Sequence, residues 1–67
     1  MSSFNEANRV KNSLKMALSN YSWYDGISVE VCGGNYVVVV NVDNNYLKSY
    51  NLIPPFKDGI NIQVSVN

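Results

Sequence analysis

The residues that could carry chemistry are few, and they lie far apart in the sequence. The chain has no histidine, which is the commonest general base in enzymes. Cys32 is the only thiol, and no cationic or imidazole side chain lies beside it in sequence to stabilise a reactive thiolate. The carboxylates are scattered, and Asp25 and Asp58 each precede a glycine, where turn formation explains them. We therefore predict no catalytic residues and no enzymatic activity.

Metal, cofactor and phosphate sites are not predicted either. A structural zinc site needs several Cys or His ligands, and the chain offers one such side chain. Gly33-Gly34 is not a phosphate-binding loop, because no helix or lysine follows it. The sequence thus indicates no metal, no cofactor and no small-molecule ligand.

Cations and aromatic rings make nucleic-acid binding the alternative function. Arg9, Lys11 and Lys15 fall on a predicted helix, and several aromatic side chains could stack on bases. These aromatic residues are Tyr21, Trp23, Tyr24, Tyr46 and Tyr50. However, five basic and five acidic side chains give no net charge, which predicts weak binding to phosphates.

The first element able to position these side chains is an amphipathic helix. Ser3 and Glu6 stand at the spacing of a capping box, in which both side chains satisfy backbone amides. Apolar residues then recur at intervals of three and four, which predicts one stripe facing the core. The stripe consists of Ala7, Val10, Leu14, Ala17, Leu18 and Tyr21. We place the helix over residues 4–20.

A β-hairpin is predicted after the helix. Asp25-Gly26 supplies a tight reversal, residues 27–32 alternate between apolar and polar, and Gly33-Gly34-Asn35 signals the hairpin turn. A two-residue loop at Gly33-Gly34 or at Gly34-Asn35 gives the same faces, because both preserve the parity of the pairing. The residues then expected to face the helix are Ile27, Val29, Val31, Tyr36, Val38, Val40 and Val42.

The rest of the chain is predicted to form a packed connection and a last strand. Residues 43–59 are too apolar for a free linker; a short helical turn over 46–50 is an option, and Pro54-Pro55 ends any helix. Asp58-Gly59 then opens a strand over residues 60–67 that alternates without a fault.

Together the elements predict a single α+β domain over residues 1–67. We expect a two-layer sandwich, with the N-terminal helix packed on a three-stranded, mainly antiparallel sheet. The last strand either pairs with the second strand as a meander or runs parallel beside the first after a crossover. The run from Tyr36 to Val42 is apolar on both faces, which favours the meander, where that strand is central.

A short internal repeat gives a further geometric expectation. Asp25-Gly26-Ile27 recurs as Asp58-Gly59-Ile60, each time before an alternating strand. The first and last strands should therefore begin at the same end of the sheet. That placement would bring Trp23 and Tyr24 near Phe56.

The favoured function is a small protein-interaction module that self-associates through its sheet. Val37 and Val39 are expected on the outer face of the sheet, inside a border of polar residues, which is the general anatomy of an interface. A second candidate patch consists of Trp23, Tyr24 and Phe56. The predicted partner is the protein itself, as a dimer or higher oligomer, or another protein.

Location and biological setting follow only from size and composition. The first residues lack the charge and apolar core of a signal peptide, and the longest apolar run is too short for a membrane-spanning helix, so a cytoplasmic protein is expected. A short, Asn-rich chain without cofactor motifs is also the kind that phages and mobile elements encode to block a host protein, which we hold as a hypothesis.

Overall fold

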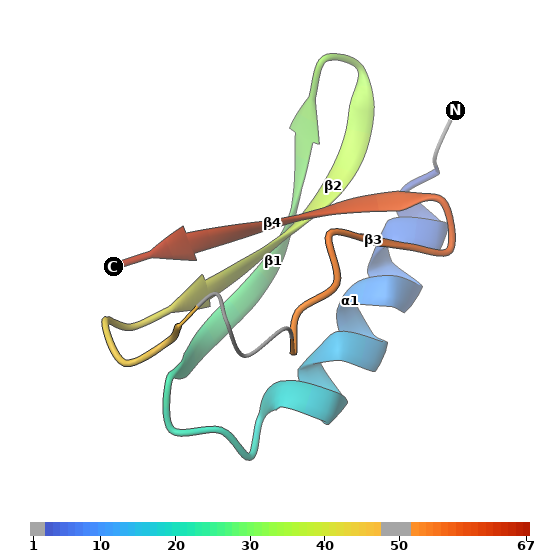
Figure 1. The fold of residues 1–67 in the computed structure, drawn as a ribbon. Coiled ribbons are helices and arrows are strands. Elements are labelled where there is room, and N and C mark those ends of the chain that lie inside the picture. Colours follow the sequence, from blue (N-terminus) through green and yellow to red (C-terminus); the bar gives the residue numbers. More distant parts are fainter. Residues whose placement is uncertain (1–2, 48–51) are drawn as a thin grey trace.

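The computed structural model describes residues 3–47 and 52–67, and it contains one helix and a four-stranded mixed sheet (Figure 1). The elements are α1 (Phe4–Leu18), β1 (Tyr24–Cys32), β2 (Asn35–Val42), β3 (Phe56–Lys57) and β4 (Ile60–Val66). The strand order is β1-β2-β4-β3. The α+β class is confirmed, but the predicted three-stranded, mainly antiparallel sheet differs in detail, because the sheet has four strands and β4 runs parallel to β2.

Helix α1 begins where the capping box predicts. The Ser3 hydroxyl accepts a hydrogen bond from the Glu6 amide and donates one to the Glu6 carboxylate, both at 3.2 Å. The core-facing side chains of the helix are Ala7, Val10, Leu14 and Leu18. The helix ends at Leu18, so Tyr21 leaves the predicted stripe, and Ala17 lies at the margin of the stripe and is exposed.

The β1–β2 hairpin has the first of the two predicted registers. Val31 lies opposite Tyr36 and Val29 opposite Val38. Gly33 and Gly34 both have positive φ, at 57° and 82°, as the favoured two-residue hairpin turn requires. The expected parity is confirmed, because Val38, Val40 and Val42 join the helix in the core.

The last strand lies beside β2, as in the meander, but it runs parallel to β2. Alternation cannot reveal direction, because an alternating strand buries the same face either way. Strands β1 and β4 consequently begin at opposite ends of the sheet. The expected approach of Trp23 and Tyr24 to Phe56 is therefore wrong: Phe56 pairs with Asn61 near the start of β4, whereas the Trp23 carbonyl accepts from the Asp43 amide at the end of β2.

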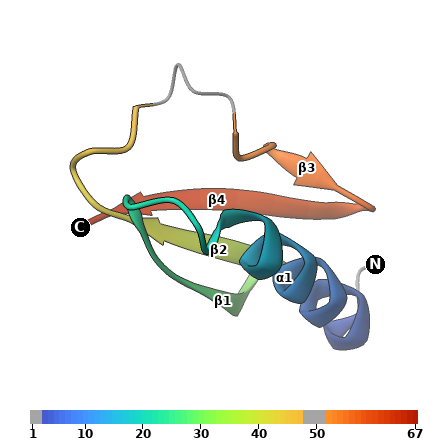
Figure 2. The same cartoon turned by 90° about the horizontal axis from the view of Figure 1, so that it is seen from below.

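The segment between β2 and β4 turns back along the sheet and packs on it. The Asn45 amide donates to the Asp43 carboxylate at 2.8 Å, which forms the predicted break after β2. Ile53 and Tyr46 then join the core, whereas Leu47, Leu52 and Phe56, which we also expected to pack, are exposed. The helix packs mainly on β1 and β2, and Tyr46 and Ile53 of the connection add to the core on the same side. Figure 2 shows β3 on the far side of β4 from β2. The optional helical turn over 46–50 falls partly outside the described residues.

The two Asp-Gly pairs play different structural roles. Asp58 and Gly59, with φ of 52° and 84°, form the two-residue turn that joins β3 to β4. Gly26 instead lies inside β1, where the register shifts between Tyr24 and Gly26 as in a β-bulge. The first strand therefore starts before the predicted reversal at Asp25-Gly26 rather than after it.

Candidate functional site

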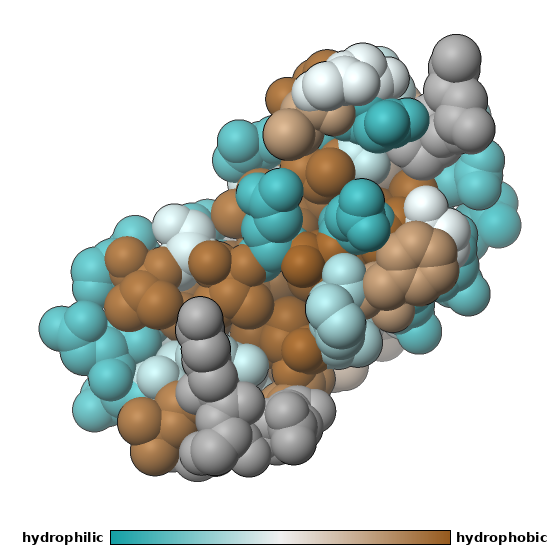
Figure 3. All heavy atoms as spheres, turned by 45° about the horizontal axis from the view of Figure 1, so that its top comes forward, coloured by the Kyte–Doolittle hydropathy of each residue, from teal (hydrophilic) through white to brown (hydrophobic). Residues whose placement is uncertain are grey.

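At β2 the outer face of the sheet offers little apolar surface. Val37 and Val39 point away from the helix, but they are only 4% and 8% exposed. Strand β2 is central, and polar side chains flank these valines, including Glu30 opposite Val37 and Gln63 opposite Val39. The Ser28 hydroxyl also donates to the Glu30 carboxylate at 3.4 Å, across this face. The hydrophobic side chains visible in Figure 3 are likewise interrupted by hydrophilic ones.

The predicted aromatic patch is divided between two ends of the molecule. Trp23 is 4% exposed; it stacks on Tyr21 at 4.9 Å and meets the edge of Tyr46 at 4.7 Å between ring centroids. Tyr24 is half-buried against the core. Phe56 is exposed at the β3 end. Trp23 thus contributes to closing the core, and only Phe56 presents a large free surface.

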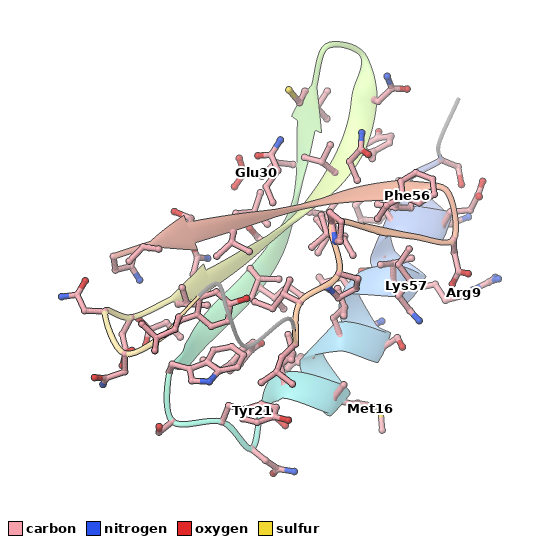
Figure 4. The ribbon with its side chains drawn as sticks, viewed as in Figure 1. Arg9, Met16, Tyr21, Glu30, Phe56 and Lys57 are labelled. Atoms are coloured by element: carbon pink, nitrogen blue, oxygen red, sulfur yellow. The ribbon has the colours of Figure 1, made fainter. Side chains whose placement is uncertain are left out.

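The three helix cations lie on different sides of the helix. Lys11 and Lys15 line a hollow of about 320 Å³ together with Tyr24, Gly26 and Ile27 of β1. Arg9 lines a separate hollow with Asp58, and Figure 4 shows it on the side of the helix toward Lys57. Arg9, Lys11 and Lys15 therefore do not form one continuous surface for a nucleic-acid backbone.

The backbone of β1 presents an open hydrogen-bonding edge. Cys32 and Asn35 flank the two-residue turn, and residues in that position exchange hydrogen bonds across the hairpin, as does every second residue beyond them. The N–H and C=O groups of Ile27, Val29 and Val31 therefore point away from β2. Among the described residues, β1 pairs with no other strand. The edge is a template for an additional strand.

An apolar border adjoins the hairpin end of this edge. Val31 is 65% exposed and Phe4 is 51% exposed, although both lie on the helix side of the sheet. Phe4 meets the edge of the Tyr36 ring at 5.7 Å, and Tyr36 lies opposite Val31. Sequence reasoning missed Phe4 and assigned Val31 to the core. The favoured meander already places the first strand at an edge, but the sequence does not show that the helix begins beside Tyr36 and leaves Val31 uncovered.

The opposite edge of the sheet is partly covered. Strand β3 pairs with Ile60 and Asn61, and the Ile62 amide donates to the Pro55 carbonyl at 2.9 Å. A hollow of about 300 Å³ adjoins it on the helix side of the sheet. Its lining residues are Tyr46, Ile53, Pro54, Pro55, Ile62 and Val64. Among the described residues, no strand pairs with this edge from Val64 onward.

Other kinds of site find no geometric support in the described part of the chain. Across residues 3–47 and 52–67, no three His, Cys, Asp or Glu side chains are placed to share a metal ion. No helix in the same residues has the length and apolar character needed to cross a membrane. The chain matches no protein-family model, and neither the curated proteins nor the solved structures gave a match.

Proposed function

We propose that the protein is an interaction module that binds by strand addition at the edge of β1, and that two copies self-associate through this edge. The observation that carries the proposal is that one side of β1, a strand of nine residues, pairs with no strand in the part of the chain that the structure describes. In strand addition, main-chain hydrogen bonds supply affinity and the alternate side chains supply specificity.

The edge has more to offer a partner than the outer face of the sheet. Val37 and Val39 are nearly inaccessible, so stacking two sheets back to back would bury little additional apolar surface. At the edge, by contrast, Val31 and Phe4 are more than half exposed beside free peptide groups. The predicted self-association through the sheet was open to stacking of the outer faces or to pairing of edge strands, and these exposures favour the edge.

A symmetric pairing of two β1 strands satisfies these groups. With the two-fold axis at Val29, each Val29 pairs with its counterpart, and Ile27 of one copy pairs with Val31 of the other. These are the residues whose peptide groups point outward, so antiparallel hydrogen bonds can form at each pair. The pairing also places the exposed Val31 side chain against Ile27 of the other copy. A two-fold arrangement of this kind closes on itself as a dimer.

Light scattering over a concentration series tests the proposal with two matched proline variants. Val31→Pro removes an outward N–H at the β1 edge, where no hydrogen bond to β2 is lost. Val66→Pro makes the same change at the β4 edge, where the neighbouring Asn67 amide keeps its bond to Val42. We expect a dimer for the wild type and for Val66→Pro, and an apparent Kd raised about tenfold or more for Val31→Pro.

Two outcomes would contradict the proposal. A wild-type protein that stays monomeric at high micromolar concentration has no such self-association. Undiminished association of Val31→Pro, with circular dichroism showing it folded, would place the interface away from β1.

A further inference from the structure

Two lysines of α1 stand beside the open edge of β1. Lys11 and Lys15 line the same hollow as Gly26 and Ile27, at the end of the edge away from the hairpin turn. Lys11 is half-buried and Lys15 is exposed, so both side chains line this hollow while their ammonium groups can reach solvent. A strand added to β1 would pass directly beside both charges.

The lysines have no acidic partner within the described part of the protein, where no ion pair to either is formed. The carboxylates of β1 are engaged elsewhere: Asp25 accepts from the Asn67 side-chain amide at 3.0 Å, and Glu30 accepts from Ser28 on the outer face. The helix side of the β1 edge is therefore positively charged, although the whole chain carries no net charge.

The spacing of the two lysines matches the repeat of an extended strand. Residues four apart on a helix are separated by about 6 Å along its axis. Residues two apart on a strand are separated by about 6.6–6.8 Å and point to the same face. The helix runs along the hairpin, because Phe4 at its start contacts Tyr36 and the residues after its end lead into β1. Two alternate side chains of an added strand can thus meet Lys11 and Lys15 together.

We propose that the preferred heterologous ligand of the β1 edge is an extended peptide segment with acidic side chains at alternate positions. The inference rests on the proposed strand addition and specifies its partner. The acidic residues face the helix side and pair with Lys11 and Lys15, while the peptide backbone bonds to Ile27, Val29 and Val31.

A second copy of the chain does not supply this charge. In the symmetric pairing, the helix side of the added strand carries Ile27, Val29 and Val31, and its Glu30 lies on the outer face. The lysines of both copies then remain unpaired on the same side of the sheet. Charge complementarity therefore favours an acidic segment over a second copy, and such a segment should compete with self-association.

Nuclear magnetic resonance titration with three synthetic peptides tests the inference. Each peptide is eight residues long and capped at both ends, and alternates Thr with Glu, Gln or Lys. We expect shifts at the amides of Ile27, Val29 and Val31, with the Glu peptide bound roughly 3- to 30-fold more tightly than the Gln peptide at low salt. The Lys peptide should bind more weakly than the Gln peptide. Added salt should reduce the preference for Glu, because exposed charges are screened.

A matched pair of double variants locates the preference. Lys11→Gln with Lys15→Gln should abolish the preference for Glu over Gln. Arg9→Gln with Lys57→Gln removes the same charge on the other side of the helix and should retain the preference.

The outcomes separate this inference from the proposed function. Equal binding of all three peptides at β1 would overturn the acidic preference and leave strand addition standing. A preference that persists without Lys11 and Lys15 would also overturn it. If no peptide shifts the β1 amides, the acidic ligand is overturned whether or not light scattering shows self-association, and strand addition then rests on the dimer alone.

Discussion

The two edges of the sheet are made from similar alternating strands, yet they differ in what they expose. At β4, strand β3 and the Pro55 carbonyl occupy the first half of the edge. At β1, no strand in the described residues pairs along the whole edge, and lysines and apolar side chains stand beside it. The strand pattern sets which face is buried, and the chain connections decide which edge stays open.

The Asp-Gly-Ile repeat shows the same dependence on context. At residues 58–60, Asp-Gly forms the turn between β3 and β4, so that β3 pairs with β4 and covers part of its outer edge. At residues 25–27, the same residues lie within β1, where the register shift bends the strand and brings no cover. A bulge at a sheet edge is a common feature, and here it borders the hollow that Lys11 and Lys15 line.

The largest effect is expected from a core substitution in β2, because unfolding the domain would destroy both edges of the sheet. Val38 lies in β2 between them and is fully buried. Val38→Asp places a carboxylate in the core without a partner, which costs more than so small a domain can tolerate. We expect loss of the folded state by circular dichroism. Ser65→Asp, on the exposed outer face, should fold normally; a folded Val38→Asp would show that the assigned faces are wrong.

A smaller effect should distinguish the two sides of β1. Glu30→Pro removes an N–H that bonds to β2 and leaves an acceptor unpaired, so it should lower the free energy of unfolding by about 1–3 kcal/mol. Val31→Pro removes only an outward N–H and should cost less. Urea denaturation measures both.

Amide hydrogen exchange gives an independent check on the wild type. Exchange should be slow at Ser28 and Glu30 and fast at Val31, while Ile62 is protected by Pro55 at the other edge. Equal costs for the two prolines, or a protected Val31 amide in the monomer, would show that the β1 edge is not open.

The smallest effect concerns the cap that holds the helix start beside the hairpin end of β1. Ser3→Ala removes the hydroxyl that satisfies the Glu6 amide and should lower the free energy of unfolding by about 1 kcal/mol. Thermal or urea denaturation measures the change. Ser19→Ala alters a long 3.5 Å contact at the other end of the helix and serves as the control, with little expected change. A Ser19 effect equal to that of Ser3 would argue against a specific cap.

The candidate site was only partly predictable. The sequence places Lys11 and Lys15 on a helix, but it leaves two hairpin registers open, and only the one observed directs the Val31 peptide groups outward. It does not reveal that the two lysines lie beside an open edge of β1, because the last strand could have paired with the first strand instead of with β2. The predicted interface valines, Val37 and Val39, are nearly inaccessible, and the side chains of the neighbouring strands, including Glu30 and Gln63, flank them on the outer face. Nucleic-acid binding, cytoplasmic location and a role in blocking a host protein remain predictions.

Local chemistry in the sequence determined the helix, its cap, the hairpin turn and the face that each strand buries. Those features depend on neighbouring residues, through side-chain periodicity and the positive φ that glycine permits. The parallel direction of β4, the two-residue strand β3 and the open edge of β1 were decided only in the tertiary structure. They depend on where the connection over residues 43–59 returns to the sheet. The alternation of apolar and polar residues predicts neither the direction of a strand nor a strand of only two residues.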